Sequence, residues 1–124
     1  MVDSSLFFRQ LLATSLEAEG HSILPAEDAE QAIELIEQGE AFDGVIADVN
    51  LPVKSGFDLA AWLRERSTEN MLPIIALSSR GSAAERQRAT EAGFDCLLKK
   101  FNAQEVLATL DDLFERASMS TGAA

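Results

Sequence analysis

The hydrophobic residues of this chain fall into two patterns that alternate along the sequence. Apolar residues with helical spacing predict helices over residues 6–19, 28–38, 57–67, 82–92 and 102–117. Short unbroken apolar runs between them predict strands at residues 23–24, 45–47, 74–77 and 96–98. Glycines at positions 20, 39 and 93 follow three of the helices, as expected of residues that end a helix.

The expected core positions of the helices are apolar side chains that share one helical face. They are Phe8, Leu11, Leu12 and Leu16 in the first helix, Ala29, Ala32, Ile33 and Ile36 in the second, Leu59, Trp62 and Leu63 in the third, and Val106, Leu107, Leu110, Leu113 and Phe114 in the last. Helices that alternate with short strands favour parallel pairing, with helices on both faces of the sheet. The expected fold class is therefore α/β, a doubly wound parallel sheet.

The segment 42–56, FDGVIADVNLPVKSG, places an acid where a buried strand ends. Asp48 follows the apolar run at residues 45–47, and Pro52 and Gly56 mark the residues after it as a loop. Open α/β sheets bind ligands at the carboxyl ends of their strands. Asp48 is therefore a candidate site residue, although an aspartate at this position could also simply cap a strand or helix end.

Other polar residues also follow predicted strand ends. They are Asp3 and Ser4, Ser78 and Ser79, and Lys99 and Lys100. Because the loops after parallel strands gather at one edge, two acids, a hydroxyl and an amine are expected at one site. Taken singly, Asp3 could cap a helix, Ser78 could be a turn hydroxyl and Lys100 could be a surface lysine, so only their combination points to a site.

Composition limits the partners and compartments that suit this chain. Its 124 residues fit one domain, and its net charge of −11 argues against nucleic acid as a direct partner, because phosphates repel it. No apolar run approaches the roughly 20 residues that span a membrane, and no signal peptide is visible. Cys96 has no second cysteine to pair with, and His21 is interpreted as structural. We expect a cytoplasmic domain that signals to another protein.

The residues at the strand ends resemble the receiver domain of two-component response regulators. DVNLPVKSG is similar to the acceptor loop of that family, with Pro52 and Gly56 at the family's spacing from Asp48. Ser78 lies 30 positions after Asp48 (48 to 78) and Lys100 lies 52 positions after it (48 to 100), as the family's hydroxyl and lysine do. The resemblance covers nearly the whole chain. It implies a flavodoxin-like, five-stranded sheet in the order 2-1-3-4-5 over residues 1–117, followed by a flexible tail at residues 118–124.

The resemblance also implies a role for each polar residue. Asp48 is expected to accept a phosphoryl group from a phosphohistidine of a histidine kinase. Lys100 is expected to neutralise the charge of that group, and Ser78 to donate a hydrogen bond to it. The domain is not expected to be an enzyme, beyond slow loss of its own phosphoryl group. A change in a contact with a protein partner would be its output.

The expected cofactor is Mg²⁺, which prefers an octahedral shell of oxygen ligands. By the resemblance, Asp3, Asp48 and the main-chain carbonyl of Asn50 would bind it. The family usually has two adjacent acids where this chain has Asp3 and Ser4. Ser4 is therefore expected to be a weak or absent ligand.

Two further departures and a narrower resemblance bear on function. The family usually has an aromatic switch residue where this chain has Leu97. Only two residues precede Asp3, so the first strand is expected to be truncated, and a homodimer or a strand swap could complete the sheet. SSLFFRQLL, ALSS and AGFDCLLKKFN, in which Phe101 follows Lys100, resemble the C-terminal receiver of hybrid chemotaxis-type histidine kinases. The phosphodonor is then expected to be a chemotaxis-type kinase, separate or part of the same polypeptide.

Three functions stay open at this point. The first is a phosphoacceptor receiver domain. The second is a degenerate receiver that acts as a phosphorylation-independent interaction module, which Ser4 and Leu97 favour. The third is a small enzyme, such as a phosphatase, with Asp48 as its nucleophile, but the sequence shows no evident general acid or base to assist it.

Overall fold

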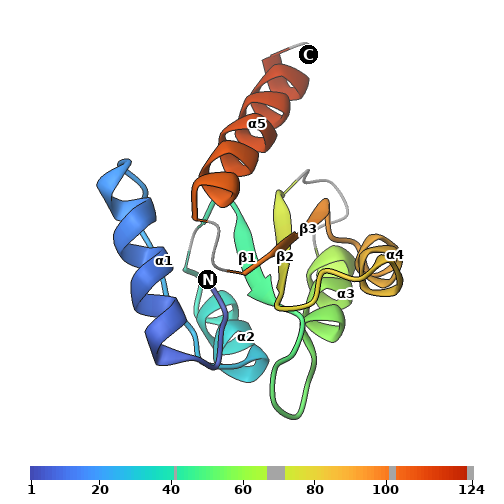
Figure 1. Ribbon diagram of the computed structural model, residues 1–124. Coiled ribbons are helices and arrows are strands. Elements are labelled where there is room, and N and C mark those ends of the chain that lie inside the picture. The colour runs from blue at the N-terminus through green and yellow to red at the C-terminus, as the bar shows by residue number, and fades with distance from the viewer. Residues whose placement is uncertain (41, 67–71, 101–102, 123–124) are drawn as a thin grey trace.

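The computed structural model describes residues 1–40, 42–66, 72–100 and 103–122. Helices and strands alternate over most of this length, as the hydrophobic pattern predicts (Figure 1). In chain order the elements are α1 (Leu6–Ala18), α2 (Ala29–Glu37), β1 (Val45–Asp48), α3 (Gly56–Arg66), β2 (Ile74–Ser78), α4 (Ala83–Ala92), β3 (Cys96–Lys99) and α5 (Ala103–Gly122). The fold class is α/β, as expected.

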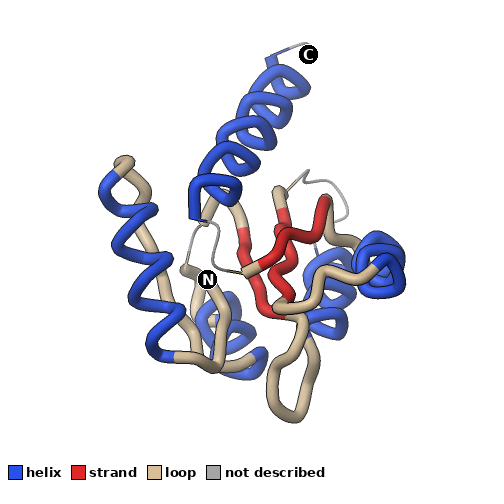
Figure 2. The backbone as a smooth tube through the Cα atoms, viewed as in Figure 1, coloured by secondary structure: helices blue, strands red, loops and turns tan. Residues whose placement is uncertain are grey.

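The three named strands form one parallel sheet in the order β1-β2-β3 (Figure 2). Val45 of β1 pairs with Ile74 of β2, and Ile75 of β2 pairs with Cys96 of β3. Every residue of β1 and β2 is buried, because helices cover both faces of the sheet. The carboxyl ends of the three strands therefore open at the same edge, which is where their polar residues lie.

Alternating side chains of the strands belong to two separate hydrophobic clusters, one on each face of the sheet. Ile46, Ile75, Leu77 and Leu98 pack with residues of α1 and α5 on one face of the sheet. Val45, Ala47, Ile74, Ala76 and Leu97 pack with residues of α2, α3 and α4 on the other. This division is the period-two consequence of a strand that is buried on both sides.

The expectation of a five-stranded sheet needs correction. The described residues form three strands, and the two segments expected to form the first and second strands make only single bridges. Val2 pairs in parallel with Ala26 on one side and with Ala47 on the other. Val2 N–H donates to Ile46 O at 2.7 Å, and Asp48 N–H donates to Val2 O at 2.9 Å. The strand expected at residues 23–24 is absent from this described segment, because its pairing contact lies beyond Pro25, at Ala26. The segment around Val2 thus lies between Ala26 and β1, which is the neighbour order expected for the first strand, although neither segment forms a strand.

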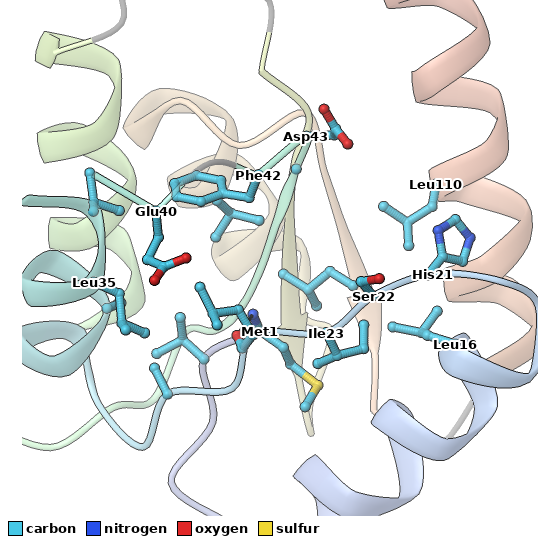
Figure 3. A pocket seen from close by; sticks show the side chains of 18 of the residues that line it. Met1, Leu16, His21, Ser22, Ile23, Leu35, Glu40, Phe42, Asp43 and Leu110 are labelled. Atoms are coloured by element: carbon cyan, nitrogen blue, oxygen red, sulfur yellow. Dashed lines mark hydrogen bonds between the residues drawn. The ribbon is translucent and has the colours of Figure 1, made fainter. Parts of the chain in front are cut away.

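A cavity of about 540 Å³ lies at the amino end of the sheet, beside these bridges (Figure 3). Residues 21–24, residues 43–46, α2 and α5 all contribute to its walls. The Met1 amino group, which also lines it, donates to Leu24 O at 3.0 Å. Burial lowers the pKa of this amino group from 8.0 to about 6.

Side-chain caps begin three of the helices. Ser5 accepts from Phe8 N–H at the start of α1, and Asp28 accepts from Gln31 N–H at the start of α2. Ser82 begins α4 in a reciprocal capping box with Glu85. The caps at Ser5, Asp28 and Ser82 agree with the starts of these helices expected from the sequence. Asn102, at which the last helix is expected to begin, lies outside the described residues.

Other sequence expectations differ from the structure in detail. Leu11 was expected in the buried stripe of α1 but is 44% exposed, and the buried position on that face belongs to Arg9 instead. Helix α5 continues to Gly122, so it includes residues 118–122 that were expected to form a tail. Among the helices described, none combines the length and the apolar character needed to cross a bilayer.

Candidate functional site

Asp48 lies at the carboxyl end of β1, 3% exposed, as its place after the apolar run predicts. Its Oδ1 accepts from Asn50 N–H at 3.0 Å, an aspartate turn in which the side chain bonds the backbone two residues on. Gly56 brings α3 against this turn, because a Cβ at Gly56 would lie 2.3 Å from Asp48 O. Only glycine allows this close approach, which explains the spacing of the loop from Asp48 to Gly56.

Asp3 is held in the same way on the neighbouring segment of chain. It is fully buried, and its Oδ1 accepts from Ser5 N–H at 2.9 Å. Arg9 of α1 donates to Asp3 O, which fixes the backbone at this point. Both aspartates therefore use Oδ1 to bind their own loop, which leaves Oδ2 for other contacts.

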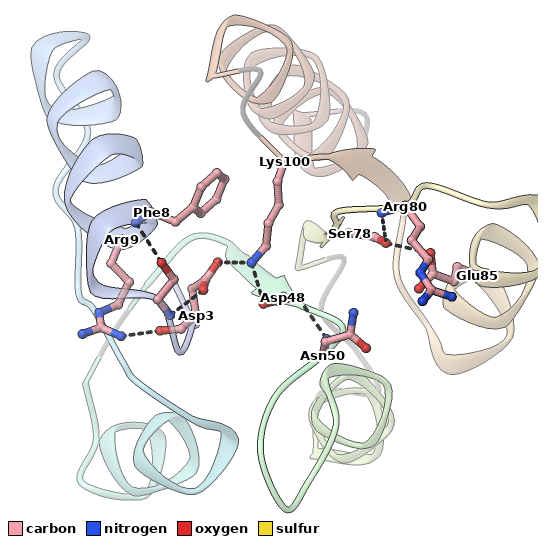
Figure 4. Close-up of polar contacts among 10 residues, drawn as sticks. Asp3, Phe8, Arg9, Asp48, Asn50, Ser78, Arg80, Glu85 and Lys100 are labelled. Atoms are coloured by element: carbon pink, nitrogen blue, oxygen red, sulfur yellow. Dashed lines mark hydrogen bonds and ion pairs between the residues drawn. The ribbon is translucent and has the colours of Figure 1, made fainter.

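Lys100 joins the two aspartates from the end of β3 (Figure 4). Its Nζ lies 2.7 Å from Asp48 Oδ2 and 3.0 Å from Asp3 Oδ2. The ammonium also lies 4.9 Å from the centre of the Phe8 ring, a distance typical of a cation–π contact. Burial alone lowers the pKa of Lys100, but its close contacts with the two carboxylates outweigh it and raise the pKa above 10.5. Lys100 therefore stays charged and holds two buried acids together.

Ser78 ends β2 at the same edge but faces a different partner. Its hydroxyl donates to Glu85 Oε1 of α4 at 2.7 Å and accepts from Arg80 N–H and Gly81 N–H, each at 3.2 Å. This hydrogen bond lowers the pKa of Glu85. The structure thus brings Asp3, Asp48 and Lys100 into direct contact and places Ser78 at the end of the neighbouring strand β2, with its hydroxyl bound to Glu85 of α4.

Comparison with known proteins agrees with this arrangement. Residues 1–111 match the family described as the response regulator receiver domain. This chain belongs to that family. The receiver is 34% identical to the transcriptional regulatory protein CpxR of Escherichia coli (strain K12) over 121 residues, and 36% identical to the response regulator MprA of Mycolicibacterium vanbaalenii over 124 residues. These matches cover 97% and 99% of the receiver but 50% and 52% of the relatives, so the chain spans about half the length of these curated proteins.

Solved structures show the same receiver fold. The chemotaxis response regulator CheY4 of Vibrio cholerae has a TM-score of 0.81 and 32% identity, and the match covers 90% of this chain and 93% of that chain. The receiver domain of the Francisella response regulator 1452 has a TM-score of 0.83 and 26% identity, with 93% of each chain covered. The flavodoxin-like receiver fold expected from the sequence is therefore present, although its first two strands are reduced to bridges in this chain.

Three residues singled out in the sequence lie away from the central contacts of this receiver. Ser4 is exposed, directly after the fully buried Asp3. Lys99 is also exposed, and its stem follows the loop after β2, where a Cβ at Gly81 would lie 2.8 Å from Lys99 Cγ. Leu97 is 3% exposed and packs in the cluster on the α2, α3 and α4 side. Of the two lysines, the one that reaches Asp48 is Lys100, as the spacing predicts.

Sequence reasoning missed three residues that shape the receiver's site. Glu85 binds the Ser78 hydroxyl, and the pattern Ser82-x-x-Glu85 is a capping-box signal that could have indicated its position. Arg9 binds Asp3 O and also lies 3.8 Å from Glu27 Oε1. It was missed because a charged residue is not expected at a buried position of a helix. Phe8 was expected only as a core residue, and no sequence pattern predicts its contact with Lys100.

The oxygen atoms at this site fit a hard divalent cation in part. Asp3 Oδ2 is buried and has no hydrogen-bond partner among the described residues, although the Lys100 ammonium lies 3.0 Å away. Asp48 Oδ2 faces the same ammonium. Within the described part of the chain, no three His, Cys, Asp or Glu side chains are grouped to hold a metal. The two carboxylates are thus the oxygen donors that the structure brings together, and water would have to supply most of the shell of a bound divalent cation.

Proposed function

We propose that this receiver domain accepts a phosphoryl group on Asp48 and uses the resulting charge to change a contact with a protein partner. The observation that carries the proposal is the part-buried contact of Asp48 with Lys100, which is shared with Asp3. A carboxylate held by its own loop and faced by a nearby cation is oriented to act as a nucleophile. The family membership and the position of Asp48 at the carboxyl edge of the sheet support the same role.

In the proposed reaction, a carboxylate oxygen of Asp48 attacks the phosphorus of a kinase phosphohistidine. A bond forms from phosphorus to this oxygen, and the bond from phosphorus to the imidazole nitrogen breaks. Asn50 N–H holds Asp48 Oδ1 in place, and Lys100 can follow the new negative charge because it already lies 2.7 Å from Asp48 Oδ2. Mg²⁺, held by Asp3, Asp48 and the Asn50 carbonyl, would neutralise charge on the transferred oxygens.

The direct test is chemical labelling with a small-molecule phosphodonor in the presence of Mg²⁺. Intact-mass measurement should show one labile phosphoryl group on the wild-type chain, and Asp48→Asn should carry none. Asn retains the shape of the side chain and removes the nucleophile, so loss of the label reports chemistry rather than unfolding. Label that persists in Asp48→Asn would show that another residue is the acceptor.

A degenerate receiver that only binds a partner is the second candidate. It is favoured by the exposed Ser4, which stands where the family usually has an acid, and by the aliphatic Leu97. The labelling experiment separates the two functions, because a degenerate receiver would stay unlabelled at any Mg²⁺ concentration. The buried Lys100 contact with Asp48 would then be structural alone.

The kinase and the output partner are proposed from chemistry and resemblance. The phosphodonor is a histidine kinase, and the motifs around Phe101 and α1 favour the chemotaxis type. The similar proteins include both a transcriptional regulatory protein and a chemotaxis response regulator, so they leave the subgroup open. The net charge of −11 favours a protein partner over direct contact of this domain with nucleic acid.

A further inference from the structure

The Ser78 hydroxyl is saturated by its present contacts. A hydroxyl has one proton to donate and two lone pairs to accept with. Ser78 donates its proton to Glu85 Oε1 at 2.7 Å and accepts from the backbone N–H groups of Arg80 and Gly81 at 3.2 Å (Figure 4). Because Ser78 is fully buried, water cannot take over one of these contacts. A new acceptor can receive this proton only if Glu85 gives it up.

Glu85 is itself part of the first turn of α4. The same atom, Oε1, lies 3.4 Å from Ser82 N and 3.5 Å from Ser82 Oγ, which are the contacts that begin this helix. The next residue, Arg86, donates to Gly81 O and to Leu97 O of β3, each at 3.2 Å. Ser78 is thus connected through one carboxylate to the start of α4, and the neighbouring guanidinium ties the same turn to β3.

We propose that Glu85 positions the Ser78 hydroxyl and competes with a phosphoryl group on Asp48 for its proton, so that phosphorylation loosens the first turn of α4. The inference rests on the proposed function, because it requires a phosphoryl group at Asp48. Both competitors are anions, so transfer of the proton contact also brings like charges toward each other and drives Glu85 away. Because Glu85 Oε1 also contacts Ser82, the first turn of α4 is the element that responds.

The test measures binding of a non-covalent phosphoryl analogue, beryllium fluoride, at saturating Mg²⁺. The signals to follow in ¹H–¹⁵N spectra are the backbone amides of Arg80 and Gly81, since both donate to Ser78 Oγ. Glu85→Ala removes the competing acceptor, and we expect half-saturation at a concentration on the order of threefold to tenfold lower than in the wild type. Glu85→Gln retains a weaker, neutral acceptor and should fall between the two.

A double-mutant cycle separates this competition from other effects of the substitution. In a Ser78→Ala background there is no proton to compete for, so Glu85→Ala should then change the affinity by less than about twofold. Glu91→Ala is the matched control, because it removes the same charge from α4 at a residue whose partner is Gln87. This control should bind the analogue as the wild type does.

The outcomes distinguish the inference from the proposed function. An affinity gain from Glu85→Ala that depends on the Ser78 hydroxyl supports the inference. An equal gain with and without that hydroxyl, or the same gain in Glu91→Ala, overturns it while the proposed function stands. If the wild-type protein neither binds the analogue nor takes label on Asp48, the proposed function fails and the inference fails with it.

Discussion

The two ends of the sheet use the same strands for opposite purposes. At the carboxyl end, Asp3, Asp48 and Ser78 are all buried, and each is held by hydrogen bonds from its own loop. At the amino end, the Met1 amino group lines an open pocket of about 540 Å³ together with apolar side chains such as Ile23 and Val45 and polar ones such as Glu40 and Asp43. The carboxyl end is filled with polar contacts, whereas the amino end holds unfilled space.

The difference teaches that instability has two separate sources in this receiver. The carboxyl end keeps two buried acids together, and its loop holds Val53, 97% exposed, at a φ of 65°, which a β-branched residue rarely adopts. Strain and buried charge of this kind concentrate where a site needs them. At the amino end the corresponding features are an open pocket and an amino group whose pKa is lowered by burial, and neither lies at the strand ends where the reaction is proposed. Changes at one end should therefore alter phosphorylation, and changes at the other should alter stability alone.

The largest expected effect is that of Lys100→Ala at the carboxyl end. The substitution leaves Asp3 and Asp48 buried beside each other without a counter-charge, which should lower the free energy of unfolding by about 3 kcal/mol. It also removes the cation that faces the phosphoryl group, so labelling should slow on the order of a hundredfold. Urea denaturation and the initial rate of labelling measure the two effects.

Lys99→Ala is the matched control for this prediction. Lys99 is the neighbouring residue, carries the same charge and is exposed, so its removal should change stability by less than about 0.5 kcal/mol and leave labelling nearly unchanged. A larger loss of labelling from Lys99→Ala than from Lys100→Ala would show that the contacts at the end of β3 are assigned to the wrong lysine.

The second prediction fills the amino end by adding Val-Ile-Leu before Met1. Val2 pairs with Ala26 and Ala47, so an added residue two positions earlier would lie opposite Leu24 and Val45, both of which line the cavity. Each buried aliphatic side chain contributes roughly 1.5–3 kcal/mol, and an added carbonyl could accept from Ile46 N–H. We expect the free energy of unfolding, measured by thermal denaturation, to rise by about 3 kcal/mol. The labelling rate should stay unchanged. Adding Ser-Gly-Ser instead is the control, and an equal gain from it would mean that apolar volume is not what this end lacks.

The third prediction concerns pH and the same Met1 amino group. Burial lowers its pKa from 8.0 in the unfolded chain to about 6 in the folded one, so between these values the unfolded chain binds more protons. Stability should therefore rise with pH from about 6 to 8, by about 2 to 3 kcal/mol. The Val-Ile-Leu extension converts this amine to an amide and should remove the rise. The same slope in both forms would assign it to another group.

The carboxyl end could be predicted from the sequence because its signals are local. A polar residue directly after an apolar run, as at Asp48 and Ser78, marks the strand end in the sequence itself. The loop from Pro52 to Gly56 could also be predicted. Gly56 is required there because a Cβ at this position would clash with Asp48 O. Lys100 was placed by the resemblance, because the receiver family has a lysine at this spacing from the acceptor aspartate, and the structure puts its Nζ in contact with Asp48.

The rest depends on contacts that sequence patterns do not encode. The capping-box signal indicates the place of Glu85 in α4 but not its contact with Ser78, which depends on how α4 packs beside β2. The contact of Phe8 with Lys100 likewise depends on how α1 packs on the sheet. Arg9 appears polar in the sequence, yet its guanidinium reaches a main-chain oxygen that only the folded loop presents. The prediction of a strand at residues 23–24 was wrong, because two apolar residues are too short a pattern to show which residue pairs with a neighbouring strand. The pairing residue is Ala26.

The smallest expected effect, Ser4→Asp, tests whether the carboxyl end is complete as a cation site. Ser4 follows Asp3 and is exposed, so an added carboxylate can reach the oxygen atoms of the site without new burial. Unit charges ~4 Å apart interact by about 4 kcal/mol at an effective dielectric constant near 20, and solvation offsets much of this. We therefore expect Mg²⁺ to bind about 10- to 100-fold more tightly, which is roughly 1.4–2.8 kcal/mol. The metal-free fold should lose stability, because three acids would then share the Lys100 ammonium.

A Mg²⁺ titration at fixed ionic strength, monitored by calorimetry or by amide chemical shifts, measures this change in affinity without the need for phosphorylation. Thr14→Asp is the matched control, because it adds the same charge to the exposed side of α1 about 12 Å along the helix from Leu6. Only Ser4→Asp should then tighten binding, and adding Mg²⁺ should restore the stability that this variant loses. Equal dissociation constants for the two variants would mean that the Ser4 side chain points away from Asp3 and Asp48. The carboxyl end would then owe its charge balance to Lys100 alone, and the acid that the family usually has at this position would have no substitute in this chain.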